Sequence, residues 1–492
     1  MSTQKKLMTN WRWWLCSLLF VATTVNYLDR QVLSLTYEEF IKPEFHWTDA
    51  HYGTITSFFS IFYAICCLFA GKFIDWMGTK KGYIIAIAVW SFGAVLHAAC
   101  GWGTTLFVDG VDSVAALKAL DVASTSSNVL LAISTTSVYL FLLCRGILAL
   151  GEAGNFPAAI KVTAEYFPKK DRAFATSIFN AGASVGALAA PLCIPPIAKA
   201  LGWEWAFIII GGLGFLWIFF WQFMYEKPEK SKHVNAAELE YIHQDDEAEA
   251  AEAQKAAADA ADEKSISLLA AFKFKQTWAF ITGKFFTDGV WWFFLFWAPS
   301  YFQNQFGHKA SDPMGQALIF TLYAIVTVVS IFGGYLPKIF VEKKGMNPYA
   351  GRMRAMLIFA FFPVAALFAQ PLGMHFNSAW WPAILIGLAG AGHQAWSANL
   401  FSTIGDMFPK STVATITGIG AMAGGVGSMI IQKVAGNLFV HAEEMGSAFT
   451  FFGFEGKPAG YFIMFCFCGI AYVLAWSIMK SLVPKYKKVV ID

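Results

Sequence analysis

Long runs of apolar residues dominate this chain, and shorter polar segments separate them. A transmembrane helix needs about 20 mostly apolar residues to cross the hydrocarbon core of a bilayer. Runs near this length cover residues 11–35, 52–71, 82–100, 138–165, 172–198, 203–225, 278–304, 313–337, 352–371, 380–407, 412–435 and 459–481. The pattern therefore predicts an all-α membrane protein with twelve transmembrane helices in two six-helix bundles.

One strongly polar segment separates the two sets of helices. The core of this segment, residues 245–263, is rich in Ala, Glu and Asp, which is typical of a solvated helix or a loose linker. We therefore expect an N-terminal bundle over residues 1–225, a cytoplasmic linker over 226–277 and a C-terminal bundle over 278–492.

Lysine and arginine gather in alternate loops: before the first span, after the second and fourth, between the eighth and ninth, and after the last. Because basic loops stay on the cytoplasmic side of a membrane, both termini and the linker are expected to be cytoplasmic. The first apolar run is longer than the core of a signal peptide and lacks a small-residue cleavage site, so it is interpreted as a retained helix. These features predict a multi-pass protein of the cell inner membrane.

Residues 101–137 mix polar and moderately apolar positions and fit neither a loop nor a span cleanly. A thirteenth span in this segment would break the alternation of charged loops. We therefore favour an outside loop that contains a short amphipathic helix, and its role is open.

Composition agrees with a membrane protein and argues against other classes. The chain is 57% hydrophobic and 14% charged, with a mean hydropathy of +0.51, too apolar for an ordinary soluble enzyme. A net charge of +3 does not suggest nucleic-acid binding. The 8 cysteines form no CxxC pair, so no metal site or disulfide framework is indicated, and no cofactor loop is found.

Four charged residues lie inside predicted spans: Asp29 and Arg30 in the first, and Arg145 and Glu152 in the fourth. A charge in the bilayer centre costs about 2.5–3.5 kcal/mol on insertion scales, so such residues usually handle a substrate, an ion or a proton. Arg145 and Glu152 are two helical turns apart and should point to roughly the same side of one helix. The four residues predict a charged path through the bilayer, as in a transporter.

The segment after the second span has the features of a tight cytoplasmic turn. Residues 71–81 (GKFIDWMGTKK) combine two glycines, an aspartate and a basic pair, which could hold one conformation until the bundles move. An ordinary basic loop explains the same residues equally well. The expected gating residues are Gly71, Asp75, Gly78, Lys80 and Lys81. A partial counterpart at 333–345 favours an internally duplicated fold.

Several blocks resemble one transporter family. Residues 71–81 look like the loop signature of the major facilitator superfamily, with Trp76 where a basic residue is usual. Blocks 26–34 (NYLDRQVLS) and 145–157 (RGILALGEAGNFP) are similar to its anion:cation symporter family. The blocks that resemble hexuronate transporters are 286–293 (FTDGVWWF), 392–401 (GHQAWSANLF), 406–409 (DMFP) and 418–424 (GIGAMAG).

The resemblance implies roles for the charged residues. Asp29 and Glu152 would be the proton-coupling carboxylates, and Arg30 would bind the substrate carboxylate. The planar guanidinium suits this task because it offers two parallel hydrogen bonds. Arg145 would favour the ionised form of Glu152, and the alternative is a static ion pair between Arg145 and Glu152 that fixes helix packing.

Sugar recognition would need hydroxyl partners and a flat apolar face. Candidates in the first half are Tyr27, Tyr63, Asn180 and Ser184. In the tenth span His393, Trp396 and Asn399 recur at three-residue steps, and the resemblance supports a substrate role for them. Packing against lipid or neighbouring helices is the alternative for each. Trp396 differs from the smaller or different aromatic residue expected there, which leaves the sugar open.

Asp288, in the seventh span, has three possible roles: to line the cavity, to pair with Lys284 one turn earlier, or to cap a broken helix. We expect a structural role. The glycine-rich run 418–427 lacks a phosphate-binding pattern, so close helix packing is its expected purpose.

The main functional prediction is a proton-coupled symporter that imports a hexuronate, such as glucuronate or galacturonate, by alternating access. It would bind an organic anion and protons within the lipid bilayer, without cofactor, metal or nucleic acid, and work as a monomer. Alternatives are a symporter for an aldonate or aromatic acid, and a non-transporting sugar-acid sensor. A membrane-embedded enzyme lacks support because no catalytic motif appears.

Overall fold

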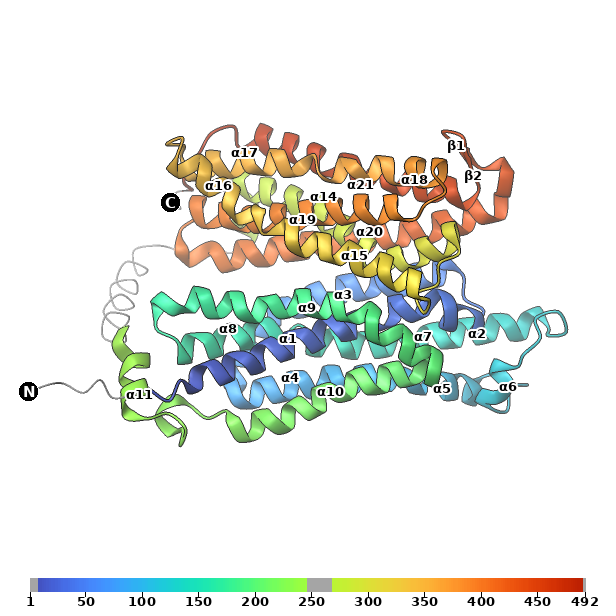
Figure 1. Ribbon diagram of the computed structural model, residues 1–492, viewed down its shortest axis with the longest axis horizontal. Helices are drawn as coiled ribbons and strands as arrows, with labels where there is room; N and C mark the ends of the chain where they lie inside the picture. Colours follow the sequence, from blue (N-terminus) through green and yellow to red (C-terminus); the bar gives the residue numbers. More distant parts are fainter. Residues whose placement is uncertain (1–7, 246–267, 490–492) are drawn as a thin grey trace, which may run out of the picture.

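The computed structural model describes residues 8–245 and 268–489, which form two bundles of long helices (Figure 1). The first half consists of α1 (Trp11–Thr36), α3 (Asp49–Met77), α4 (Thr79–Leu96) with α5 (Cys100–Phe107), α7 (Ser127–Glu152) with α8 (Asn155–Tyr166), α9 (Lys169–Leu201) and α10 (Trp203–Met224). The second half consists of α14 (Lys275–Phe306), α15 (Pro313–Ser330) with α16 (Phe332–Glu342), α17 (Pro348–Ala360) with α18 (Ala366–His375), α19 (Trp380–Met407), α20 (Lys410–Met445) and α21 (Lys457–Leu482). The predicted architecture of two six-helix bundles is confirmed.

Short elements connect the long helices. They are η1 (Tyr37–Ile41), α2 (Lys42–Glu44), η2 (His97–Ala99), α6 (Val114–Lys118), η3 (Pro228–Lys230), α11 (Ala236–Ile242), η4 (His243–Asp245), α13 (Leu268–Ala271), η5 (Pro363–Ala365), η6 (Gly446–Ala448), β1 (Thr450–Phe451) and β2 (Phe454–Glu455). The two strands form an antiparallel hairpin in which Thr450 faces Glu455.

Hydropathy separates the helices into two groups. Over the described residues, nine spans are long and apolar enough to cross a membrane by length and composition. The three other long helices, α1, α14 and α19, bury polar side chains such as Asp29, Lys284 and His393. These three helices therefore carry some of the polar residues from which a path could be built, while Arg145 and Glu152 lie on α7, one of the nine apolar spans.

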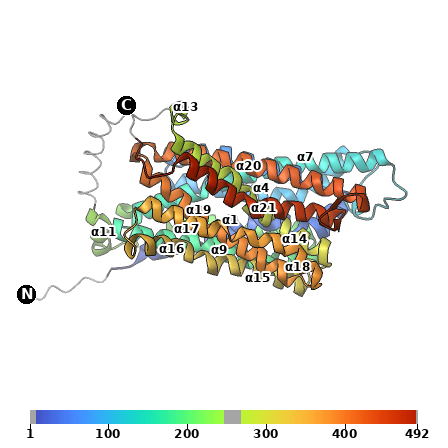
Figure 2. The same cartoon turned by 90° about the horizontal axis from the view of Figure 1, so that it is seen from above.

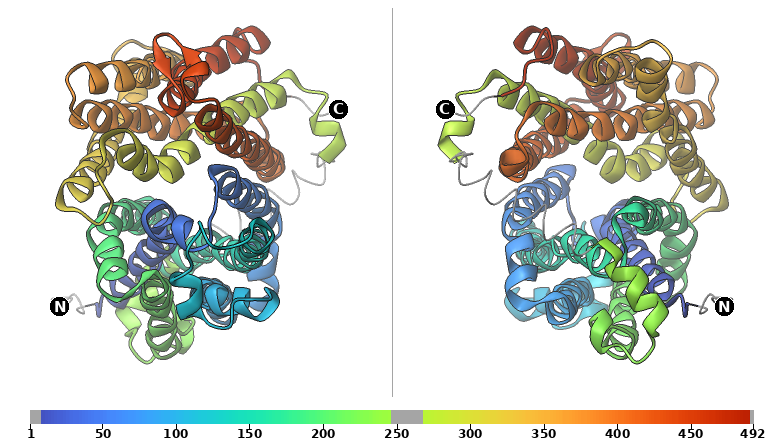
Figure 3. Two further views of the ribbon diagram at one scale, coloured as in Figure 1. Left: turned by 90° about the vertical axis from the view of Figure 1, so that its right-hand side faces the viewer. Right: turned by 90° about the vertical axis from the view of Figure 1, so that its left-hand side faces the viewer.

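The two bundles lie side by side in Figure 1, and the helices of both run roughly along the long axis of the molecule (Figure 2). Viewed along that axis, residues of the first half and of the second half form separate groups (Figure 3). Helix α1 begins and α21 ends at the same end of the molecule, which we call the terminal end. The opposite end carries α6 and the hairpin, and we call it the α6 end.

Polar contacts join the two halves toward the α6 end. They include the ion pair of Lys457 with Asp49 at 2.7 Å, the Tyr52 hydroxyl donating to the Phe296 carbonyl at 2.8 Å, and the Ser311 hydroxyl donating to Glu39 at 2.7 Å. Glycines bring α3 and α20 close there: a Cβ on Gly53 would lie 2.7 Å from the Gln432 carbonyl oxygen. The halves are therefore bridged at the α6 end.

The segment between α5 and α7 contains the expected short helix, α6, which is far too short to span a bilayer. The predicted limits of the flanking spans were wrong, because α5 extends to Phe107 and α7 starts at Ser127. Lys118 fastens α6 to the bundle through an ion pair with Glu204, and Glu44 lies 3.9 Å away.

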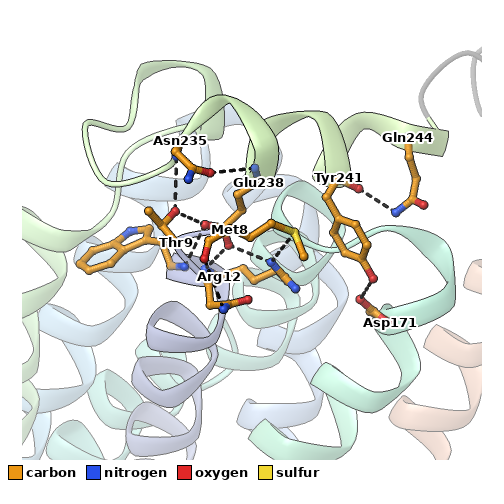
Figure 4. A network of polar contacts seen from close by, with 10 residues as sticks. Met8, Thr9, Arg12, Asp171, Asn235, Glu238, Tyr241 and Gln244 are labelled. Atoms are coloured by element: carbon orange, nitrogen blue, oxygen red, sulfur yellow. Dashed lines mark hydrogen bonds and ion pairs between the residues drawn. The ribbon is translucent and has the colours of Figure 1, made fainter. Parts of the chain in front are cut away.

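The described start of the linker packs onto the first half (Figure 4). Glu238 of α11 is buried and accepts hydrogen bonds from the Thr9 hydroxyl, from the backbone N–H groups of Trp11 and Arg12, and from the Arg12 guanidinium at 2.9 Å. A carboxylate at a helix N-terminus is favourable because it satisfies free N–H groups there. The expectation of a solvated helix or loose linker at 245–263 lies almost entirely outside the described residues, and the domain limits stay a prediction.

Candidate substrate and coupling site

Arg30 of α1 is the centre of the buried charged residues. Its Nη2 and Nε atoms lie 2.8 and 3.1 Å from Oε2 of Glu152, the last residue of α7. The exposed fractions of the two side chains are 6% and 0%. A charge-assisted contact of this kind is stable only while both partners stay together, since removal of one leaves a buried charge.

Aromatic rings surround the Arg30 guanidinium. Its Cζ atom lies 4.7 Å from the ring centre of Tyr63, 5.2 Å from Tyr27, 5.1 Å from Trp292 and 5.9 Å from Phe59. Guanidinium groups are attracted to aromatic faces at these distances. Trp292 belongs to α14, so Arg30 of the first half reaches the face of the second half.

A close approach between helices fixes Glu152. A Cβ on Gly151 would lie 2.2 Å from the backbone nitrogen of Trp90, so only glycine lets α7 come this near to α4. Helix α7 ends directly after Gly151 and Glu152, and Gly154 caps the start of α8. The carboxylate therefore lies at a helix break, where Oε1 has no hydrogen-bond partner among the described residues.

Asp29 is buried beside its neighbour Arg30 without pairing with it. Successive residues of a helix point about 100° apart, and the Asp29 carboxylate lies near Trp90 of α4 instead. Within residues 8–245 and 268–489, neither carboxylate oxygen has a hydrogen-bond partner. Burying an unpaired charge is costly, so this position suits a group that takes up and releases a proton.

Arg145 does not form the ion pair with Glu152 that the spacing allowed. Its guanidinium stacks over Phe59 at 5.3 Å, and within the described part of the chain Nη1 has no hydrogen-bond partner. Glu152 pairs with Arg30 instead. The alternative of a static Arg145–Glu152 pair is therefore wrong in this conformation.

Two candidates of the tenth span, His393 and Trp396, both contact Tyr472 of α21. The His393 ring stacks on Trp291 at 5.6 Å, and its Nδ1 lies 2.7 Å from the Tyr472 hydroxyl. Trp396 is fully buried and meets the Tyr472 ring edge-on at 5.5 Å. The indole is therefore part of the packing between α19 and α21.

Asn399 is buried at the contact between α19 and α16. Its amide donates to the backbone carbonyls of Gly333 and Ala395, at 2.9 and 2.8 Å. On α9, Asn180 is exposed and Ser184 is half-buried. None of these three side chains contacts Arg30, so their roles in substrate binding stay predictions.

Two aromatic residues of the site were not predicted from the sequence. Trp292 contacts Arg30, and Phe59 contacts Arg145. An aromatic residue in an apolar run has no distinguishing pattern, and only Trp292 falls in one of the blocks that resemble hexuronate transporters. Lys284 and Asp288 form an ion pair at 2.6 Å on α14, one of the expected possibilities. Lys284 also lies 4.6 Å from the Phe401 ring centre.

The expected gating residues lie at the turn from α3 to α4, at the terminal end. They are Gly71, Asp75, Gly78, Lys80 and Lys81. Asp75 forms an ion pair with Lys161 of α8 at 2.7 Å, and Lys80 pairs with Glu226. Gly78 adopts φ 77°, which favours glycine, and so sets the turn. A gating role for these residues stays a prediction.

Comparison with known proteins places this architecture in a family. The family model described as "Major Facilitator Superfamily" matches residues 19–431. The chain belongs to this superfamily. It is therefore a membrane transport protein and not an enzyme.

Individual relatives match most of the chain at low sequence identity. The chain is 26% identical over 428 residues to the hexuronate transporter of Escherichia coli K12, with 87% of each chain covered. It is 26% identical over 365 residues to the galacturonate transporter of Dickeya chrysanthemi, covering 73% of this chain and 92% of that one. It is also 26% identical over 427 residues to a D-galactonate transporter of Escherichia coli O6:H1, covering 86% and 87%.

Solved structures agree with the fold. A D-xylose-proton symporter superposes with a TM-score of 0.66 at 15% identity, covering 96% of this chain and 99% of that chain. A bacterial homologue of the human lysosomal transporter Spinster, in an inward-facing and occupied conformation, superposes with a TM-score of 0.63 at 18% identity, covering 96% and 97%.

Proposed function

We propose that this protein is a proton-coupled symporter that imports a hexuronate, such as glucuronate or galacturonate, by alternating access. The observation that carries the proposal is the buried Arg30–Glu152 ion pair. Its arginine contacts aromatic rings of the first half and Trp292 of the second half. The names of the relatives, a hexuronate transporter and a galacturonate transporter, support the class of substrate.

Arg30 is proposed to bind the substrate carboxylate. Its guanidinium can hold a carboxylate through two parallel hydrogen bonds. In this conformation its Nε–H and an Nη2–H both donate to Oε2 of Glu152. The faces of Tyr27, Tyr63 and Trp292 near Arg30 offer flat apolar surfaces against which a pyranose ring can pack. These aromatic residues, rather than Trp396, are therefore proposed to contact the ring.

Proton coupling follows from competition for Arg30. When the substrate carboxylate engages Arg30, Glu152 loses its partner, and a buried carboxylate without a partner is stabilised by taking up a proton. Asp29, buried without a hydrogen bond among the described residues, is proposed as a second proton carrier. Arg145 keeps a positive charge near both carboxylates and favours release of the proton.

Coupling also meets an energetic need. An anion that enters a negative-inside cell is opposed by about 2.3 kcal/mol per charge for each 100 mV. One proton carried with each hexuronate removes this penalty, because the pair is then neutral.

We further propose that the terminal end faces the cytoplasm of a cell whose inner membrane holds the protein as a monomer. The basic loops support this orientation. The contacts that bridge the halves would then close the outside, as for Asp49 with Lys457. Both termini and the linker would be cytoplasmic, and 226–277 would connect bundles spanning 1–225 and 278–492.

The test is uptake of labelled glucuronate into proteoliposomes, with and without an inward proton gradient. We expect the gradient to drive accumulation and a protonophore to abolish it. Unlabelled galacturonate should compete, whereas a neutral hexose should not. Uptake that ignores the gradient would contradict the coupling.

A second candidate is a symporter for an aldonate, favoured by the similarity to a D-galactonate transporter. An aldonate has a carboxylate for Arg30 but no closed ring to pack on the aromatic faces. Unlabelled galactonate that competes more strongly than galacturonate would select this candidate over the first.

A further inference from the structure

A cavity of about 440 Å³ opens at the terminal end of the second half, between the start of α14 and the chain after α21. Five lysines line it, together with uncharged residues that include Gln276. The lysines are Lys273, Lys275, Lys485, Lys487 and Lys488.

Three contacts hold the chain after α21 in place and so shape this lysine cavity. The Val489 backbone N–H donates to the Met407 carbonyl at 2.8 Å. The Tyr349 hydroxyl donates to the Val483 carbonyl at 2.8 Å, and the Gln276 amide donates to the Lys487 carbonyl at 3.2 Å. The lysine side chains therefore extend from a fixed backbone.

Within residues 8–245 and 268–489, the charge of the lysine cavity is unbalanced. Among these residues no Asp or Glu lines the cavity, and none of its five ammonium groups forms an ion pair. Five positive charges around one cavity repel one another, and an anion inside would relieve this repulsion.

Exposed apolar side chains lie next to the lysine cavity in the sequence. The exposed fraction is 80% for Leu269, 36% for Phe272 and 47% for Trp278. The Trp278 indole N–H donates to the Phe272 carbonyl at 2.8 Å, so the two residues form one surface. Tryptophan beside lysine is typical of the boundary between lipid headgroups and acyl chains.

We propose that the lysine cavity binds the phosphodiester headgroup of an anionic phospholipid. The lysines surround the phosphate, and Leu269, Phe272 and Trp278 lie along the acyl chains. Basic pockets of transmembrane proteins recognise anionic headgroups in this way. The proposal is independent of the transported substrate.

The test is titration of the purified full-length protein in neutral detergent with short-chain phosphatidylglycerol, followed by native mass spectrometry. Phosphatidylcholine and inorganic phosphate are titrated in parallel. We expect phosphatidylglycerol to bind at least tenfold more tightly than either. Equal affinity for phosphatidylcholine would overturn the proposal, and equal affinity for inorganic phosphate would assign the cavity to a free anion.

The role of the lysines in lipid binding is tested by a variant in which Lys485, Lys487 and Lys488 are replaced with glutamine. Each lysine near an anionic headgroup contributes about fivefold in affinity, so we expect a loss on the order of a hundredfold. If that variant fails to fold, Lys273→Gln with Lys275→Gln tests the opposite wall, with an expected loss of roughly 25-fold.

The matched control removes the same charge elsewhere at the terminal end. Lys227, Lys230 and Lys232 are exposed residues after α10, and Lys227 lies by a cavity lined also by Glu165 and Glu229. Glutamine at these three positions should change the affinity less than threefold. A loss as large as in the lysine cavity would mean a general surface charge and no defined site.

Discussion

In the first half, Arg30, Glu152, Asp29 and Arg145 are buried together, and three of them keep polar atoms without hydrogen-bond partners among the described residues. In the second half, Lys284 pairs with Asp288 on its own helix at 2.6 Å. The first arrangement joins two helices, and we propose that a substrate can replace Glu152 in it. The second joins two residues of one helix, so we propose that the exchangeable charges lie in the first half alone.

The first prediction concerns Arg30→Lys, which should reduce uptake strongly. The ammonium keeps the charge but loses the paired hydrogen bonds to a carboxylate, each worth about 1.5–3 kcal/mol. We expect uptake of glucuronate into proteoliposomes at limiting substrate to fall by roughly 10- to 100-fold. Arg352→Lys is the control, since Arg352 also pairs with a carboxylate, Asp406 at 2.7 Å, but lies in the second half. An equal loss in both variants would remove the distinction between the halves.

The next prediction compares the Lys284–Asp288 pair, which we expect to be structural, with the Arg30–Glu152 pair, which we propose to be exchangeable. Lys284→Gln leaves Asp288 buried without its cation, which should destabilise the protein by about 3–5 kcal/mol. Adding Asp288→Asn should restore the midpoint of thermal unfolding and most of the uptake. The matching pair of changes, Arg30→Gln with Glu152→Gln, should restore folding but leave no uptake. Recovery of uptake in this second double variant would contradict the account.

A smaller effect tests how Glu152 is positioned. Gly151→Ala would place a Cβ 2.2 Å from the Trp90 nitrogen, and overpacking of this kind costs about 1–3 kcal/mol. The midpoint of thermal unfolding should fall, and so should uptake. Gly212→Ala on α10 is the control, because a Cβ there meets nothing within 4 Å. Equal midpoints for the two variants would show that the close approach is not needed.

The last effect is a pH dependence of stability that lies outside the spans, at Glu44 of α2. Burial raises the pKa of this carboxyl to about 7, although the Trp203 indole and Lys118 lower it. Because the folded protein then holds this proton more tightly than the unfolded chain, stability falls as the pH rises from about 4.5 to about 7, by at most about 1.4 kcal/mol per pH unit. Glu44→Gln should flatten this slope in thermal unfolding. An unchanged slope would exclude Glu44 as its source.

The spans could be predicted from sequence because membrane crossing sets a length of apolar residues that is visible in the chain. A short helix between the third and fourth spans was predicted for another reason, because a thirteenth span there would break the alternation of charged loops. The ends of α5 and α7 were not, since polar positions at a membrane surface can continue a helix beyond the bilayer. The break after Glu152 depends on Gly154 and on the contact of Gly151 with α4, which no local pattern reveals.

The site was predictable as a set of residues but not as a set of contacts. Charged residues in apolar runs are easily recognised as candidates, because placing a charge inside a bilayer costs free energy and is therefore rare. Whether Glu152 meets Arg145, seven residues away, or Arg30, 122 residues away, depends on how α1 lies beside the junction of α7 and α8. The three-residue steps did group His393 with Trp396, which both contact Tyr472 of α21, but they also grouped Asn399, which contacts α16 instead.

The measurement that tests the central claim most directly compares two activities of Glu152→Gln in proteoliposomes. One is exchange of labelled for unlabelled glucuronate without a proton gradient, and the other is accumulation driven by an inward proton gradient. Because glutamine resembles the protonated carboxyl, we predict exchange close to that of the unchanged protein and no accumulation. Accumulation that persists, or exchange lost as completely as accumulation, would contradict coupling through Glu152.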